Sequence, residues 1–175
     1  MHASQSADAA ANGGGATLSS QQFLTFEVGD ELFAVPILAV QEIRGWEKAA
    51  HIPHSQDHIL GIINLRGTVV PVLDVRARLG LPAREATQTT VVIVVRIASA
   101  SGTRTVGCVV DAVSDVATID EGQVMPAPEA CGSVDSHFLS GVATIEKRLV
   151  LLLDVGRLIE VAKRAAEEGD VSLVA

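Results

Sequence analysis

The densest group of potential metal ligands lies in the segment HIPHSQDH, which contributes His51, His54, Asp57 and His58. Imidazole and carboxylate groups are natural zinc ligands when the backbone lets them converge. Pro53 and the shortness of the segment keep these histidines off a common helical face. We therefore interpret the segment as a solvated connector, and we expect no metal site.

Two pairs of carboxylates have residue types suited to general acid and base chemistry, namely Asp111 with Asp115 and Asp74 with Asp154. Asp74 and Asp154 each end an apolar run and precede a helical turn, where an aspartate caps free amide groups. The sequence contains no G-x-S-x-G, P-loop, G-x-G-x-x-G or H-E-x-x-H motif. We therefore expect neither a catalytic site nor a cofactor.

Arg66 separates two apolar runs, GIINL before it and TVVPVLDV after Gly67. The neighbouring glycine tolerates the positive φ of a tight hairpin turn. The arginine is therefore expected at a hairpin tip, with its side chain in solvent. Two interpretations stay open: an ordinary charged turn, or a recognition group whose planar guanidinium holds a carboxylate or carbonyl of a partner.

The segment VQEIR, residues 40–44, mixes apolar and charged residues more than a strand with one buried face requires. We expect it on the edge of a barrel. Val40 with Glu42 would then form an exposed apolar and acidic patch, although Val40 fits a core position equally well. Trp46, the only tryptophan, fits either an interface or the core.

These residues must be positioned mainly by β-structure, because short runs rich in Val, Ile and Thr recur along the chain. The predicted strands are FLTFEV, ELFAVPI, GIINL, TVVPVLDV, TTVVIVVRI, TVGCVVDAV and LVLLLDV. The residue pairs spaced to close hairpins are Gly29-Asp30, Arg66-Gly67 and Ser101-Gly102. One C-terminal helix is predicted over residues 155–168, capped by Asp154 and ended by Gly169.

The chain also contains an internal repeat. Residues 33–43 align with 106–116, and residues 61–75 align with 141–155 in the same order. Short strands at this density favour small closed barrels, so the duplication predicts an all-β protein of two similar barrels that meet along a groove. The sequence leaves open whether the two copies exchange strands.

The polar stretch PAREATQ links the two copies and places their boundary near residue 85. The predicted organisation is a flexible tail over 1–19, one domain over 20–168 with barrels at roughly 20–85 and 86–153 followed by the helix, and a tail over 169–175.

Composition excludes several classes of partner. A formal charge of −8 and an aromatic content of 3% argue against nucleic-acid binding, which needs basic surfaces and stacking platforms. No apolar run approaches the ~20 residues of a membrane-spanning helix, so direct membrane insertion is not expected. The two cysteines have neither zinc nor redox spacing and are expected to be reduced thiols.

Several segments together resemble the CheW family of bacterial chemotaxis coupling proteins: VQEIRGW, IPH, GIINLRGTVVPVLDVRARLG, TTVVIVV, VGCVVDAVSDV and MPAPE. The resemblance implies two five-stranded OB- or SH3-like barrels related by duplication, without catalytic activity. It also implies an adaptor that joins the cytoplasmic tips of transmembrane chemoreceptors to the regulatory domain of the histidine kinase CheA. Such a protein is expected to be cytoplasmic, monomeric alone, and multimeric when recruited to receptor arrays at the inner membrane.

The resemblance further implies binding residues. Those that match family positions linked with receptor or kinase binding are Arg66, Val40, Glu42, Gly61 and Val91. The family often has an aromatic residue after MPAPE, where this chain has Ala130 and Cys131, so we expect weaker ring-forming contacts. Two alternative functions remain open: a small-ligand-binding β-barrel module, and a coupler of a non-flagellar chemosensory system.

Overall fold

A computed structural model describes residues 19–55, 57–131 and 134–159 of the chain. Its strands are β1 (Ser20–Val28), β2 (Glu31–Pro36), β3 (Val40–Gly45), β4 (Ile59–Leu65), β5 (Thr68–Asp74), β6 (Val91–Ser99), β7 (Gly102–Val110), β8 (Ala112–Asp120), β9 (Ala130–Cys131), β10 (Val134–Asp135), β11 (Leu139–Ile145) and β12 (Arg148–Leu153). The short helices are η1 (Ile37–Ala39), α1 (Val75–Arg78), η2 (Glu121–Gln123) and η3 (Ser136–Phe138).

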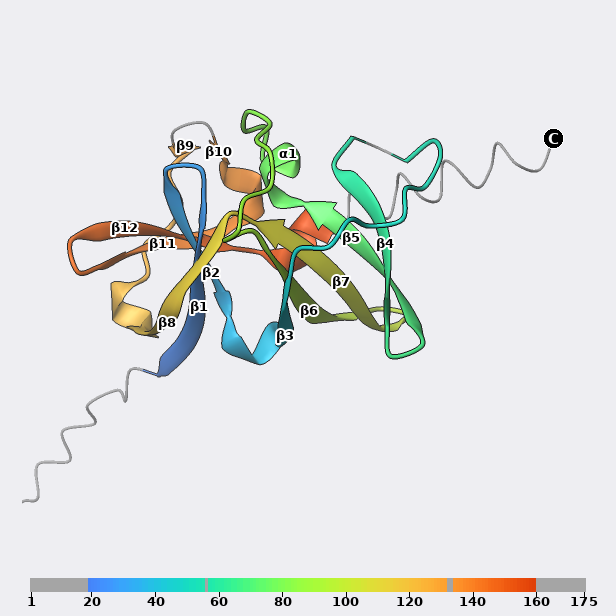
Figure 1. The fold of residues 1–175 in the computed structure, drawn as a ribbon. Coiled ribbons are helices and arrows are strands. Elements are labelled where there is room, and N and C mark those ends of the chain that lie inside the picture. Colours follow the sequence, from blue (N-terminus) through green and yellow to red (C-terminus); the bar gives the residue numbers. More distant parts are fainter. Residues whose placement is uncertain (1–18, 56, 132–133, 160–175) are drawn as a thin grey trace, which may run out of the picture.

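Most strands form two five-stranded sheets that lie side by side (Figure 1). We call them the Arg66 sheet, ordered β3-β6-β7-β5-β4, and the Glu146 sheet, ordered β11-β12-β2-β1-β8, after the tips of their β4–β5 and β11–β12 hairpins. β9 and β10 form a separate small ribbon. The predicted all-β class with two five-stranded units is confirmed.

Each sheet takes strands from both sides of residue 85. The chain leaves the Glu146 sheet between β2 and β3, and it returns there between β7 and β8. As a result β2 lies parallel to β12, and β5 lies parallel to β7. A boundary near residue 85 therefore separates the sequence copies but does not separate the two sheets.

The internal repeat is present in the strand register. Val72 of β5 faces Gly107 of β7, and their repeat equivalents, Leu152 of β12 and Ala34 of β2, face each other in the same way. The antiparallel pairs β3–β6 and β1–β8 also have bulges at equivalent positions, between Val40 and Glu42 in β3 and between Val113 and Asp115 in β8. The two copies are therefore related by a pseudo-twofold arrangement in which the exchange of strands is reciprocal.

The ends of the equivalent hairpins are closed by equivalent bonds. The Asp74 amide donates to the His58 carbonyl at 2.7 Å, and the Asp154 amide donates to the Phe138 carbonyl at 2.8 Å. The Asp74 carboxylate also accepts the amide of Arg76 at 3.0 Å, and Asp154 does the same for a later amide in its own turn. Both aspartates thus act as helix caps.

The largest hydrophobic cluster joins the two sheets. Its fully buried members include Phe26 and Phe33, whose rings stack with centroids 5.9 Å apart, together with Ile93, Leu151 and Leu158. Two smaller clusters lie within the individual sheets. Because the main core is shared, the two sheets fold as one unit.

Some predicted details differ or lie beyond the description. The β6–β7 turn is formed by Ala100 and Ser101, one position earlier than predicted, because Ser99 pairs directly with Gly102. The C-terminal helix begins at Val155, as predicted, and is described as far as residue 159. The remainder of the predicted helix, residues 160–168, lies outside the described residues, as do both predicted tails apart from residue 19, which is exposed. Within the described ranges, no helix is long and apolar enough to cross a membrane.

Candidate partner-binding site

Arg66 lies at the β4–β5 tip in a left-handed backbone conformation. Its φ is 51° and that of Gly67 is 86°, the pattern of a type I′ turn, whose twist suits a two-residue hairpin. The Asn64 carboxamide oxygen accepts the Gly67 amide at 2.8 Å and fixes the turn. The Arg66 side chain is 80% exposed, as the sequence predicted for a hairpin tip.

Glu42 holds the Arg66 side chain in place. The Arg66 Nη2 donates to Glu42 Oε2 at 3.0 Å, and Arg44 Nε lies 3.8 Å from Glu42 Oε1. β3 and β4 are opposite edges of the Arg66 sheet, so this ion pair joins the two edges and shows how strongly the sheet curves. Such an exposed pair contributes only ~0–1 kcal/mol to stability, and its main effect is to orient the guanidinium.

Val40 and Val91 flank this ion pair without joining it. Val40 begins β3, is half-buried and packs against the main core, while Val91 begins β6, is also half-buried and faces Gly45 at the other end of β3. Trp46 is half-buried against the smaller cluster of the Arg66 sheet. Each of these side chains is therefore partly packed against the core and partly exposed. Val40 and Trp46, which the sequence allowed either in the core or at a surface, lie between those two positions.

Gly61 has a different role from the other predicted site residues. A Cβ at this position would lie 2.1 Å from the Ala50 carbonyl oxygen, and its φ is +147°. Ala50 and Ile62 exchange backbone hydrogen bonds of 3.0 Å there, so the connector after β3 runs directly over β4. Gly61 is buried and lies about 16 Å along β4 from Arg66. It therefore shapes the backbone and is not brought together with Arg66 and Glu42.

Sequence reasoning missed exposed apolar residues on, or directly before, the strands that carry or flank the predicted site residues. Ile43 alternates with Glu42 on β3 and is 44% exposed, Val69 follows the Arg66 turn and is 62% exposed, and Leu38 in η1 is 90% exposed. The strand alternation around Glu42 carried a signal for Ile43. Leu38 lay beside a predicted strand end, and its exposure follows from the 3-10 turn that separates β2 from β3.

The groups considered for metal or acid-base chemistry have structural roles or no convergent geometry. His51 and His54 are exposed and His58 is half-buried, and no cluster of three or more metal-ligating side chains occurs within the described ranges. Burial raises the pKa of the Cys108 thiol to about 12 and makes it unreactive.

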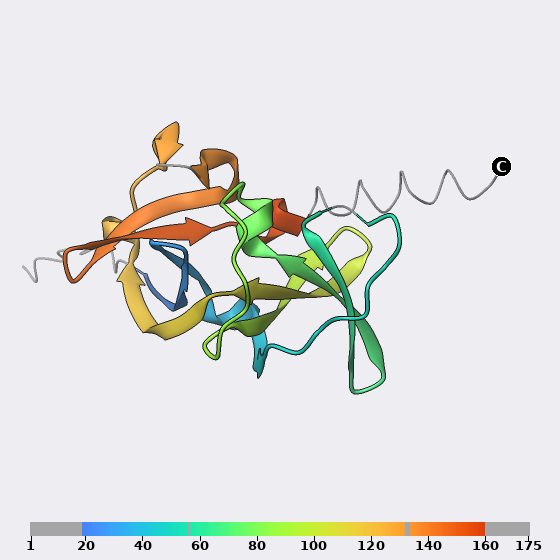
Figure 2. The ribbon, with the colours of Figure 1, turned by 45° about the horizontal axis from the view of Figure 1, so that its top comes forward.

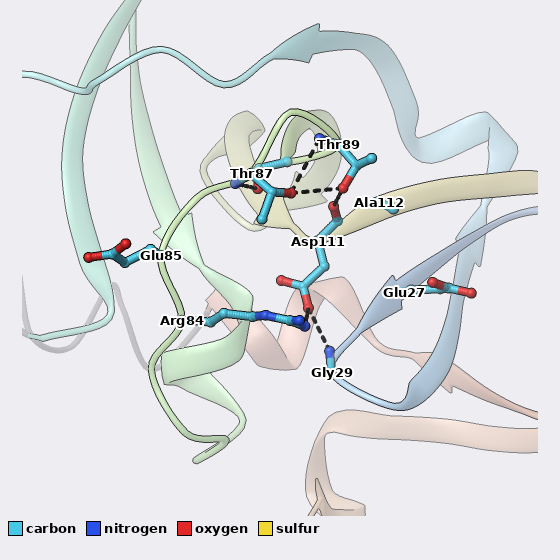
Figure 3. A pocket seen from close by; sticks show the side chains of 9 residues that line it. Glu27, Gly29, Arg84, Glu85, Thr87, Thr89, Asp111 and Ala112 are labelled. Carbon is cyan, nitrogen blue, oxygen red and sulfur yellow. Dashed lines mark hydrogen bonds and ion pairs between the residues drawn. The ribbon is translucent and has the colours of Figure 1, made fainter.

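Asp111 is held in a polar network. Its carboxylate pairs with the Arg76 guanidinium and accepts the Gly29 amide at 2.7 Å. Figure 3 shows this aspartate in a polar hollow, with Arg84 below it and Thr87 and Thr89 above it. The lining is charged and hydroxylic, unlike the mostly apolar wall of a small-molecule pocket.

Comparison with known proteins decides the family. The protein-family model described as the CheW-like domain matches residues 22–163 of this chain. The chain belongs to the CheW-like family. It is 40% identical over 150 residues to the chemotaxis protein CheW of Rhizobium meliloti (strain 1021), covering 86% of this chain and 94% of that protein. It is 38% identical over 139 residues to the chemotaxis protein CheW of Klebsiella aerogenes, covering 79% and 81%.

A solved structure of the CheW-like family agrees with the fold. The scaffolding protein TtCheW from Thermoanaerobacter tengcongensis superposes with a TM-score of 0.73 at 29% identity, covering 81% of this chain and 88% of that one. The predicted resemblance to CheW is confirmed, and the protein is a chemotaxis coupling adaptor. The comparisons do not favour the small-ligand-binding alternative.

Proposed function

We propose that this CheW-like protein joins chemoreceptors to the histidine kinase CheA, and that Arg66, positioned by Glu42, is a central contact for the receptor. The observation that carries the proposal is the 3.0 Å bond between these residues at a tip where Arg66 is 80% exposed. An ion pair that adds little stability but fixes a solvent-facing guanidinium supports a role in recognition.

The chemistry of the guanidinium fits the tip of a helical hairpin. A helix ends with backbone carbonyls that have no partner within the helix, and an arginine offers several donors in a planar fork. Glu42 engages the Nη2 end of this fork, so other N–H groups can reach a carbonyl or carboxylate. Val40 of β3 would supply apolar contact on the same strand as Glu42. Val91 and Gly61 support the surface through packing and backbone shape.

The adaptor acts stoichiometrically and without a catalytic step of its own. Recruitment to receptor arrays at the inner membrane follows from receptor binding. Binding of one adaptor to one partner is expected to have micromolar affinity, which corresponds to a binding free energy of about −8 kcal/mol. Many such contacts in an array act together. At the position where the family often has an aromatic, Cys131 is buried in the core, and we propose a weaker assembly contact there.

The test is kinase autophosphorylation in receptor membranes with CheA from the same organism. We expect wild-type protein to activate the kinase, Arg66→Glu to fail, and Arg66→Lys to activate partially. Lys147→Glu, at the equivalent tip of the Glu146 sheet, is the matched control and should activate normally. Full activation by Arg66→Glu would mean that Arg66 is an ordinary turn residue with no role in receptor binding. Failure of the wild-type protein to activate the kinase would contradict the proposed adaptor function.

A further inference from the structure

The two copies of the repeat depend on each other for every complete sheet. Four strand pairings join the first copy to the second: β1 with β8, β2 with β12, β3 with β6, and β5 with β7. The main hydrophobic cluster also draws on both copies. Neither copy can therefore complete a five-stranded sheet with its own strands.

The only described segment that connects the copies outside the sheets is residues 81–90, which we call the strap. Figure 2 shows it running from α1 across the junction of the two sheets to β6. Residues 82–89 of the strap are exposed and form no strand. The strap thus has the position and exposure of a hinge loop.

We propose that two copies of this chain can exchange halves through the strap. In that dimer, residues 19–80 of each chain would assemble with residues 91–159 of the other. Every strand pairing and every core contact between the halves would be made between chains with unchanged geometry, as in other domain-swapped proteins. The partner is a second copy of this chain, and the product is an adaptor with two complete CheW-like units.

The strap makes a few side-chain contacts, of which only the one between Arg84 and Asp111 ties the middle of the hinge to the second half of the same chain. Arg76 Nη1 donates to the Pro82 carbonyl at 3.0 Å, Arg84 Nη1 lies 3.8 Å from Asp111 Oδ2, and Thr89 Oγ1 donates to the Asp111 carbonyl at 2.9 Å. The Arg76–Asp111 pair joins the two halves themselves and would be kept in either form. The balance between monomer and dimer therefore depends on weak, exposed strap contacts and on protein concentration.

Exchange must separate the halves and expose the shared core. A folded monomer should therefore convert very slowly, and the choice between the two forms is made when the chain folds. High concentration during refolding favours the dimer.

The first test shortens the hinge. Deletion of residues 84–88 removes five positions, which reduces the reach of the strap by about 17 Å. Size-exclusion chromatography with light scattering should show a folded dimer after refolding at high concentration. Replacement of the same five residues by glycine and serine is the control and should remain mostly monomeric. A folded, monomeric deletion variant would overturn the proposal.

The second test identifies the topology and uses the intact strap. Gln22 of β1 faces Thr118 of β8, and both are exposed. One chain carrying Gln22→Cys and another carrying Thr118→Cys are refolded together, with oxidation afterwards. The native thiols do not interfere, because Cys108 and Cys131 are buried. A disulfide between chains, increasing several-fold with refolding concentration, is expected, and Arg84→Ala should increase it further.

The double variant, with both new cysteines in one chain, shows that the pair can form a disulfide in the monomer. If that intrachain bond forms readily while no interchain bond appears at any refolding concentration, the exchange does not occur. This outcome is informative even if the shortened chain fails to fold. A dimer of the shortened chain that forms no interchain bond would likewise contradict the exchange.

Discussion

The two hairpin tips of this protein share a backbone but differ in chemistry. Glu146 and Lys147 have φ values of 49° and 66°, close to those of Arg66 and its glycine neighbour. In the Arg66 sheet the tip pairs with Glu42, whereas the repeat equivalents of Arg66 and Glu42 in the other copy are Glu146 and Asp115, which are both acidic. The two copies thus share the turn geometry. Only the first copy has the residues for an arginine–glutamate ion pair at these two positions.

The crossovers between the sheets show the same contrast. Asp111, between β7 and β8, is surrounded by Arg76, Gly29 and the strap. Its repeat equivalent between β2 and β3 is Leu38, which is 90% exposed. Equivalent places in the fold have therefore become a polar junction in one copy and an open apolar surface in the other.

The largest expected effect compares two equivalent glycines. Alanine at position 61 would place its Cβ 2.1 Å from the Ala50 carbonyl oxygen at a φ of +147°, whereas alanine at 141 would meet the Met125 carbonyl oxygen at 2.9 Å. We expect Gly61→Ala to lower the free energy of unfolding by about 3 kcal/mol or more, and Gly141→Ala by about 1–2 kcal/mol. Urea unfolding measures both. Equal losses of stability would mean that the segments around Ala50 and Met125 move aside equally well to accept the added methyl group.

The second prediction tests the polar crossover. Arg76→Met leaves the Asp111 carboxylate without its most buried partner, and we expect a loss of about 2–3 kcal/mol. The value is below that for fully buried pairs because the Asp111 side chain is 26% exposed. Arg76→Met combined with Asp111→Leu, which copies Leu38, should recover most of the stability in urea unfolding. If the double variant is as unstable as the sum of the single ones, the pair is not energetically coupled.

The third prediction concerns His58, whose repeat equivalent is Phe138. Burial, and secondarily the positive charge of Arg78, lowers the pKa of His58, while Asp57 partly opposes this shift. The folded protein then binds a proton less readily than the unfolded chain. His58 should therefore cost no stability above its ordinary pKa of 6.5 and should reduce stability as pH falls below that value.

The control for this pH effect is His58→Phe, which copies the other repeat. Within the described residues the His58 Nε2 is buried without a hydrogen-bond partner, so phenylalanine removes no hydrogen bond at that atom. The difference in melting temperature between pH 7.5 and pH 5.5 should be smaller for the variant than for wild type. An unchanged difference would assign the pH dependence to other groups.

The smallest effect is expected at the Glu146 tip. Lys147 has a φ of 66°, which glycine adopts without strain, as Gly67 does in the other hairpin. Lys147→Gly should raise the free energy of unfolding by at most about 1 kcal/mol, because relief of the left-handed strain exceeds the extra entropy that glycine loses on folding, and it should leave kinase activation unchanged. Thermal unfolding and the autophosphorylation assay measure these two quantities. A loss of activation would show that this tip also contacts a partner.

Much of the local structure could be predicted from particular residues. The Arg66-Gly67 pair predicted a hairpin tip, and Asp74 and Asp154 predicted helix caps, because turns and caps depend on residues close in sequence. The edge position of β3 followed from its mixed composition. The role of Gly61 could not be predicted, because its close neighbour Ala50 approaches through a connector without regular structure.

The sequence by itself determined the β-class, the two hairpin tips, the capped turns and the order of the repeated segments, since each depends on side-chain alternation or on a few adjacent residues. Only the tertiary structure decided that β2 pairs with β12 and β5 with β7, and that Glu42 holds Arg66. These contacts join residues distant in sequence. The repeat gives each copy nearly the same strand patterns, so local pattern cannot choose between pairing within a copy and pairing across copies. Packing of one shared core makes that choice.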